Sequence, residues 1–195
     1  MPLPLFAGLL LATAAIWYVI RRTDPVETRR LSRYKPFSAE ARTLFEEAAR
    51  FAKLPVEWAS TDALHRILEK ESNGWVGIPN YTYGTKWGAP KDATSGEKHR
   101  VVLNHRAEWP IVWGELRDGR MTGDQFVHRG KTVRSSATGL GQMTLPNVDE
   151  FYPSHRVGIG DPLEEAVGML RYLHKQYNGP ENALAEYGLR HGEGY

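Results

Sequence analysis

The chain has no cysteine among its 195 residues. This absence excludes disulfide bonds, catalytic thiolates and zinc sites built on cysteine. A chain without cysteine folds in an oxidising or a reducing compartment alike, so cysteine content does not locate the protein. The 7 histidines show no spacing typical of metal ligands. We therefore expect neither a metal ion nor a cofactor.

A large excess of charge of one sign is also missing. Lys and Arg together number 25 and Asp and Glu 23, which gives a formal net charge of +2. No run of Lys and Arg forms the footprint of a nucleic-acid-binding surface, so we expect no nucleic-acid partner. The small positive excess fits an ordinary solvated surface. It equally fits a weak attraction to anionic polymers such as peptidoglycan or to an acidic membrane face.

A long run without charge occurs near the N-terminus, at Leu3–Ile20. About 18 apolar residues in a helix approach the thickness of the hydrocarbon core of a membrane. Arg21 and Arg22 close the run, as interfacial anchors do. We expect an N-terminal hydrophobic, transmembrane-like helix over residues 1–22, with Leu3–Ile20 in contact with the membrane. A signal peptide cleaved near residues 12–14 and a helix packed in an oligomer or larger particle are the alternatives.

A basic linker is predicted over residues 23–37, which are polar and contain Pro25 and Pro36. It is either simply solvated or in contact with anionic lipid headgroups. Arginines follow the hydrophobic run, and under the positive-inside rule they would keep the rest of the chain in the cytoplasm. The sequence leaves the orientation in the membrane open.

Residues 38–195 have the pattern of a mainly α domain, large enough for one hydrophobic core. Apolar residues recur at helical spacing in four stretches: 38–54, 60–74, 161–177 and 180–191. Ser38 is a suitable N-cap for the first stretch, and Asp161 with Pro162 forms a strong start signal for the third. Asn73 and Gly74 are suitable residues for the end of the second.

An insertion of about residues 75–134 separates the second helical stretch from the later ones. It is rich in glycine, proline and aromatic residues and shows no clean period, which predicts an irregular or short-stranded segment. One short helix is expected within it, at residues 108–119. Its aromatic residues would either stack on sugar faces or form a small core of the insertion: Trp75, Tyr81, Tyr83 and Trp87.

Glu71 is the best-placed candidate for a catalytic acid. It lies at the C-terminal end of a predicted helix, where the negative end of the helix dipole disfavours a charged carboxylate. Partial burial would disfavour the charge further. Both effects favour a protonated carboxyl near neutral pH, as a general acid requires. A solvated surface glutamate is the alternative interpretation, and Glu69 fits that description better.

Four short motifs follow one another along the chain: "ES" at residues 71–72, "GLGQ" at 139–142, "GMLRYL" at 168–173 and "NALAEYG" at 182–188. In this order they resemble the lysozyme-like domain of the lytic transglycosylases of the soluble type. The variety found in bacteriophage virion and tape-measure proteins is the most similar. The resemblance covers about Leu54 to Tyr195, and the insertion between the first two motifs is longer than the family pattern.

The resemblance implies a lysozyme-like fold and an enzyme with one catalytic carboxyl, Glu71. It implies cleavage of the β-1,4 bond between N-acetylmuramic acid and N-acetylglucosamine, with formation of a 1,6-anhydro ring. The segment around Gly139 would pack on the catalytic helix and line the floor of the cleft. The implied substrate-binding residues are Ser72, Gly139, Leu140, Gly141, Gln142, Met143 and Tyr187.

Several of these residues have a structural interpretation as well. Gln142 would bind sugar or would satisfy the turn in which it lies. Tyr187 would contact Glu71 or sugar, or would serve in packing only. Met143 fits a core position, and Ser72 fits the polar end of a helix.

Other functions stay open at this point. If a carboxylate of the insertion reaches the cleft, a hydrolytic muramidase becomes possible, since hydrolysis by the usual route needs two carboxylates. The candidates for this second group are Asp92, Glu97 and Asp124. A non-catalytic wall-binding or structural virion protein and a wall-remodelling enzyme of a secretion machine are further alternatives.

The expected partners are glycan strands of peptidoglycan, together with other proteins of a virion or of the bacterial envelope. The expected location is a virion or the envelope, anchored in the inner membrane and acting in the periplasm. For a phage particle, the activity would open the wall locally during genome ejection.

Overall fold

The structure is a computed structural model that describes residues 32–190, except for the side chains of residues 187–190. Within that range no helix is both long and apolar enough to cross a membrane. The predicted hydrophobic helix at 1–22 and most of the predicted linker at 23–37 lie outside the described residues. The described end of that linker belongs to the folded body, because Arg33 forms an antiparallel bridge with Trp75.

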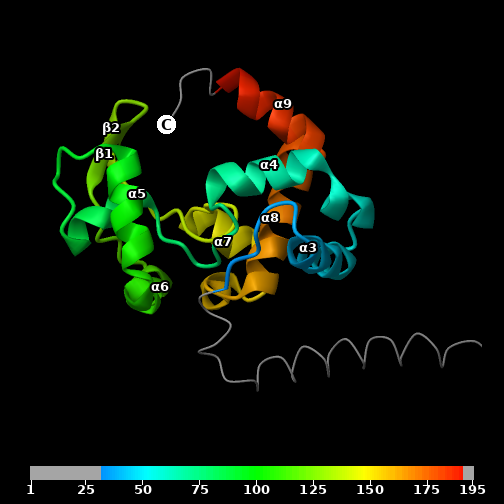
Figure 1. Cartoon of the computed structure of the whole chain (residues 1–195), viewed down its shortest axis with the longest axis horizontal. Coiled ribbons are helices and arrows are strands. Elements are labelled where there is room, and N and C mark those ends of the chain that lie inside the picture. The colour runs from blue at the N-terminus through cyan, green and yellow to red at the C-terminus, as the bar shows by residue number, and fades with distance from the viewer. Residues whose placement is uncertain (1–31, 191–195) are drawn as a thin grey trace, which may run out of the picture.

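The described part of the chain is mainly helical, as the sequence predicts (Figure 1). The α-helices are α3 (Ala39–Ala52), α4 (Asp62–Glu71), α5 (Ser95–Asn104), α6 (Trp109–Arg117), α7 (Leu145–Phe151), α8 (Pro162–Tyr177) and α9 (Pro180–Arg190). The strands are β1 (Gln125–His128) and β2 (Lys131–Arg134). Short 3-10 helices span Val56–Ser60, Tyr81–Trp87, Arg106–Glu108 and His155–Gly158.

Side-chain caps fix where the predicted helices begin. The Ser38 hydroxyl accepts a hydrogen bond from the Ala41 amide at the start of α3, at 3.1 Å. Thr61 caps α4 in the same way, and Asp161 accepts from two amides at the start of α8. Each cap satisfies amides that the helix itself leaves unpaired, so the beginnings of these helices follow from local sequence.

Helices α3, α4, α8 and α9 enclose one hydrophobic core. Helix α3 packs on α8, and α4 packs on α9 (Figure 1). Fully buried members come from α3, α4 and α8, and include Phe45, Leu64, Leu68 and Leu170. Leu140, which lies far from these helices in the sequence, is part of the same core. The core therefore ties the predicted 139–142 motif to the helix that carries Glu71.

The insertion has regular structure and its own core, so the prediction of an irregular segment is wrong for much of it. Trp109 and Trp113 of α6 are fully buried together with Tyr83, and Trp75 packs edge-to-face on Trp109 at 6.0 Å between ring centroids. Tyr83 is thus a core residue. Trp87 stacks on His105 at the end of α5, with ring centroids 5.6 Å apart.

Helix α5 was not predicted, because its apolar signal is weak. Only Lys98 and Val102 of this helix are buried. A capping box fixes its start instead: the Thr94 hydroxyl accepts from the Glu97 amide, and the Glu97 carboxylate accepts from the Thr94 amide.

The short strands expected in the insertion form one antiparallel hairpin, in which Gln125 pairs with Arg134 and His128 with Lys131. The residues of its tip, Arg129 and Gly130, both have positive φ, as a two-residue hairpin turn requires.

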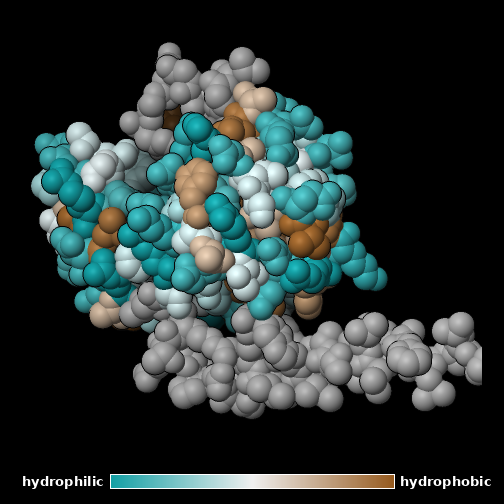
Figure 2. All heavy atoms as spheres, turned by 45° about the vertical axis from the view of Figure 1, so that its right-hand side comes forward, coloured by the Kyte–Doolittle hydropathy of each residue, from teal (hydrophilic) through white to brown (hydrophobic). Residues whose placement is uncertain are grey.

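The face drawn in Figure 2 is mostly hydrophilic, with apolar residues in small separate patches.

Candidate functional site: a groove beside Glu71

A groove with a cavity volume of about 260 Å³ lies between α4, α7, α8 and the segment 139–143, which we call the glycine turn. Helix α4 contributes Ile67 and Glu71, and α9 contributes Ala183. The remaining lining residues are Gly141, Gln142, Met143, Thr144, Asn147, Met169, Tyr172, Leu173 and Tyr177. The groove therefore brings together Glu71 and part of the 139–143 motif, which are about 70 residues apart in the sequence.

Glu71 is the last residue of α4, at the helix end that the sequence predicts, and its side chain is half-buried. The helix ends there because Asn73 and Gly74 adopt positive φ values of 51° and 78°. A side chain at position 74 would put its Cβ 1.9 Å from the Tyr34 carbonyl oxygen, so only glycine fits. Backbone geometry therefore fixes the position from which Glu71 projects.

Ser72 supports this helix end and does not line the groove. Its side chain is 2% exposed, and its hydroxyl donates to the Leu68 carbonyl and accepts from the Gly74 amide at 3.1 Å. Of the two interpretations of Ser72, the structure places it as the polar residue that ends α4.

Short backbone hydrogen bonds close the glycine turn. Thr138 and Met143 exchange two of them, at 2.9 and 3.2 Å, and the Gln142 amide donates to the Gly139 carbonyl. Gly139 has a φ of 76°. At Gly141 an added Cβ would lie 3.1 Å from Met169 of α8, so the turn approaches α8 closely. Residues 141–143 of the turn thus line the groove, and the turn packs on α8.

The members of the turn divide between groove and core. Gly141, Gln142 and Met143 line the groove, although Met143 is only 2% exposed. The Leu140 side chain is fully buried in the core and Gly139 faces α8, so neither lines the groove. The Gln142 amide nitrogen donates to the Ile78 and Gly139 carbonyls at 3.0 and 3.3 Å. Gln142 therefore braces the turn with its nitrogen, and its Oε1 is the atom that a donor on a ligand would use.

Two tyrosines of the groove were not identified as site residues from the sequence. Tyr172 and Tyr177 of α8 line it and contact each other at 6.0 Å between ring centroids, with the planes 70° apart. Tyr172 also packs edge-to-face on Phe151 of α7. Both tyrosines lie in the predicted α8, but periodicity alone does not distinguish a core aromatic from one at the edge of a groove. Tyr187 is on α9, and its side chain lies outside the described residues.

Glu165 was also missed, and it is the most unusual carboxyl near the site. It is fully buried, and its oxygens accept hydrogen bonds from the amides of Gly77, Leu140 and Gly160. Burial raises the pKa of Glu165 to about 7, against the lowering effect of these three bonds. Its sequence position in the first turn of α8 suggested only a favourable interaction with the helix dipole. Its partners are backbone amides, so the glycines at 77, 139 and 160 were the signal that could have revealed it.

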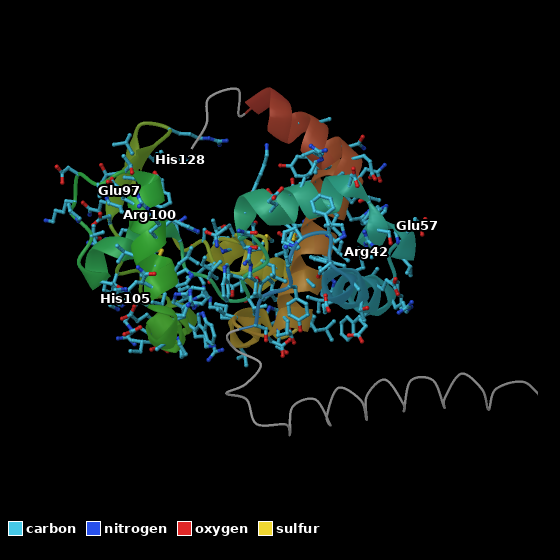
Figure 3. All side chains as sticks on the ribbon, viewed as in Figure 1. Arg42, Glu57, Glu97, Arg100, His105 and His128 are labelled. Atoms are coloured by element: carbon cyan, nitrogen blue, oxygen red, sulfur yellow. The ribbon has the colours of Figure 1, made fainter. Side chains whose placement is uncertain are left out.

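Glu71 is the only carboxylate among the described residues that line the groove. The insertion's carboxylates are engaged elsewhere: Glu97 caps α5, and Asp124 pairs with Lys98 at 2.9 Å. Asp92 is exposed and is not among the lining residues. In Figure 3, Glu97 lies with α5 at one end of the molecule, and Arg42 and Glu57 mark the other end. None of the three candidate second carboxylates reaches the groove.

Over residues 32–190, no group of three or more His, Cys, Asp or Glu side chains is placed to hold a metal ion. No family model, curated protein or solved structure matches this chain.

Proposed function

We propose that the protein is a peptidoglycan lytic transglycosylase with a lysozyme-like domain. One observation carries the proposal: Glu71, at a helix end, shares a groove with Gly141 and Gln142 of the glycine turn. This is the pairing that the resemblance implied for a catalytic acid and the floor of its cleft. The substrate would be the β-1,4 bond between N-acetylmuramic acid and N-acetylglucosamine.

The charges of the groove favour transglycosylation over hydrolysis. A glycosidase of the usual kind needs two carboxyl groups that flank the scissile bond, about 5–10 Å apart. Among the described residues that line the groove, Glu71 is the only acid. A single carboxyl is sufficient if the substrate supplies the second group itself, through the acetamido oxygen of the muramyl sugar.

The reaction then needs two proton transfers at one residue. Protonated Glu71 donates its proton to the glycosidic oxygen as the bond to the anomeric carbon breaks, and the substrate's acetamido group stabilises the positive charge at that carbon. The Glu71 carboxylate next accepts the proton of the muramyl 6-hydroxyl as its oxygen bonds to the anomeric carbon. The 1,6-anhydro ring forms, no water is consumed, and Glu71 ends in its starting state.

The lining of the groove fits a glycan strand. Tyr172 and Tyr177 offer aromatic faces and hydroxyl groups, and aromatic side chains are a common platform for sugar rings. Asn147 and Thr144 offer polar groups at the same groove. Apolar walls with a few polar groups are typical of binding sites for small ligands or short stretches of polymer.

We further propose that the enzyme acts locally on the wall, as a component of a phage particle or of an envelope complex, with glycan strands as its partner. The hydrophobic run Leu3–Ile20 would hold it at a membrane or in the particle. Cell fractionation that follows the full chain distinguishes membranes, particles and soluble fractions.

Digestion of purified peptidoglycan, with mass analysis of the products, tests the proposed activity. Anhydro-muropeptides are the expected products, and reducing ends would instead show hydrolysis. Glu71→Gln should reduce product release at least about a hundredfold, because general acid catalysis typically contributes that much. Glu69→Gln is the matched control, since Glu69 lies on the same helix but is exposed. If the wild type releases no product, or if Glu71→Gln retains full activity, the proposal is wrong.

A further inference from the structure

The Glu165 carboxyl joins three segments that are distant in the sequence. Oε2 accepts from the Gly77 amide at 3.0 Å and from the Leu140 amide at 2.9 Å. Oε1 accepts from the Gly160 amide at 2.8 Å. The residue is fully buried in α8, so these amides have no access to bulk water as an alternative partner. One side chain therefore fixes the loop after α4, the glycine turn and the loop before α8.

The backbone approaches this carboxyl and the neighbouring Trp113 ring closely. An added Cβ at Gly139 would lie 2.6 Å from Glu165 Oε2, and one at Gly160 would lie 2.7 Å from the Trp113 ring. The Trp113 indole N–H donates to the Gly77 carbonyl at 2.6 Å. The backbone amide of Gly77 and its carbonyl are therefore both hydrogen-bonded, the first to Glu165 and the second to Trp113. Glycine is required at these positions because the backbone itself contacts the carboxyl and the indole.

We propose that Glu165 is a positioning residue, whose carboxylate holds the glycine turn and thereby sets the wall of the groove that Glu71 shares. The inference rests on the proposed glycan-cleaving function. Leu140 N–H, which Glu165 binds, immediately precedes Gly141, and Gly141, Gln142 and Met143 line the groove. A shift of the Leu140 amide must therefore move the atoms that would contact the sugar. Glu165 touches no substrate, since it lies behind the turn.

The arrangement of donors matches the ionised carboxyl. Three N–H groups point at two oxygens, and a protonated oxygen would turn its own hydrogen toward one of these donors. Asp161, at the N-cap of α8, is the acidic group that raises the pKa of Glu165 further. The buried Tyr152 hydroxyl, just after α7, has its own pKa raised by burial and by Glu165, so it stays neutral. The segments 76–79, 137–143 and 158–160 contain no titratable side chain. Protonation of Glu165 would therefore break one of these hydrogen bonds and loosen the turn, because no side chain of these segments could take the place of the carboxylate.

Glu165→Gln and Glu164→Gln form a matched pair of variants. Both residues are buried on the first turn of α8, but Glu164 accepts from the amide and hydroxyl of Ser154, away from the groove. In Glu165→Gln the amide nitrogen must face a backbone N–H, so at least one of the three bonds is lost. We expect Glu165→Gln to lower the turnover of peptidoglycan about tenfold or more relative to Glu164→Gln. Equal losses in the two variants would overturn the inference.

A second measurement needs no activity and uses the wild-type chain. The backbone amide resonances of Gly77, Leu140 and Gly160 should shift together with pH, with one common midpoint, because they bind one carboxyl. The shifts should be absent in Glu165→Gln and present in Glu164→Gln. A Leu140 amide that does not titrate with the other two would overturn the inference even if the enzyme is active. Wild-type protein that shows the common titration but releases no muropeptide would instead contradict the proposed function alone.

Discussion

The close contact between the glycine turn and Glu165 predicts a large stability loss for Gly139→Ala. The perturbation has two parts. Gly139 has a φ of 76°, and an alanine in this left-handed region costs about 1 kcal/mol. The new Cβ would also lie 2.6 Å from the Glu165 carboxyl carbon, and overpacking of this kind costs about 1–3 kcal/mol. The expected loss is therefore about 2–4 kcal/mol in the free energy of unfolding.

Gly130→Ala separates the two parts of this loss. Gly130 has nearly the same φ, 74°, but nothing lies within 4 Å of an added Cβ. Only the cost of the left-handed backbone should appear there, about 1 kcal/mol. Urea unfolding of both variants and the wild type gives the difference in the free energy of unfolding, provided that this free energy depends on urea concentration with the same slope in all three. If the two variants lose the same stability, the tight contact at Gly139 does not exist and the argument for Glu165 loses its geometric basis.

The remaining predictions concern the groups around Glu165. Trp113→Phe removes the indole donor to the Gly77 carbonyl in a fully buried site, and it should cost about 1–3 kcal/mol in the free energy of unfolding, measured by urea titration. Relative to Glu165→Gln, the wild type should lose stability as pH rises from about 4.5 to about 7, because burial raises the pKa of Glu165 to about 7, so that the native state keeps its proton where the unfolded chain has lost it. A difference in urea midpoint between the wild type and Glu165→Gln that stays constant or grows over this range would contradict that assignment.

The helices with strong local signals were predictable from sequence. Helix α8 has a capping aspartate, a proline at its first position and an apolar stripe, and its predicted start agrees with the structure. Helix α4 ends where Asn73 and Gly74 predict it to end. These features depend on residues within a few positions of one another, so a single sequence contains them in full.

The insertion was predicted less well, because contacts between residues distant in the sequence stabilise its helices and its core. Trp109 and Trp113 are buried against Ile78, Val148 and Ile159, and no local period marks these partners. Helix α5 presents few apolar residues to this core, so a capping box rather than a periodic stripe defines it. The aromatic residues therefore indicated a core or a sugar platform without deciding between them.

The candidate site was also only partly predictable from the sequence. Ordered motifs predicted that Glu71 and the glycine turn belong together, and Glu71 lines one groove with residues 141–143 of the turn. The support beneath the turn was invisible, since Glu165 acts through the backbone amides of three remote segments. Any residue except proline can donate a backbone N–H, so such donors cannot be recognised in a sequence. Only the glycines that let the backbone come close to the carboxyl are visible there. Gly77, Gly139 and Gly160 were the available clue, and only their three-dimensional arrangement gives it meaning.

The proposed roles of Glu71 and Glu165 require opposite protonation states. In the proposed reaction Glu71 must carry a proton when substrate binds, whereas the donors around Glu165 match a carboxyl that has lost its own. Burial raises the pKa of Glu165 to about 7, so the turn reaches its fully bonded form only toward neutral pH. Turnover should therefore fall on the acidic side because the turn loosens. The acidic limb belongs to a residue that never contacts the sugar, which is why Glu165→Gln should remove that limb.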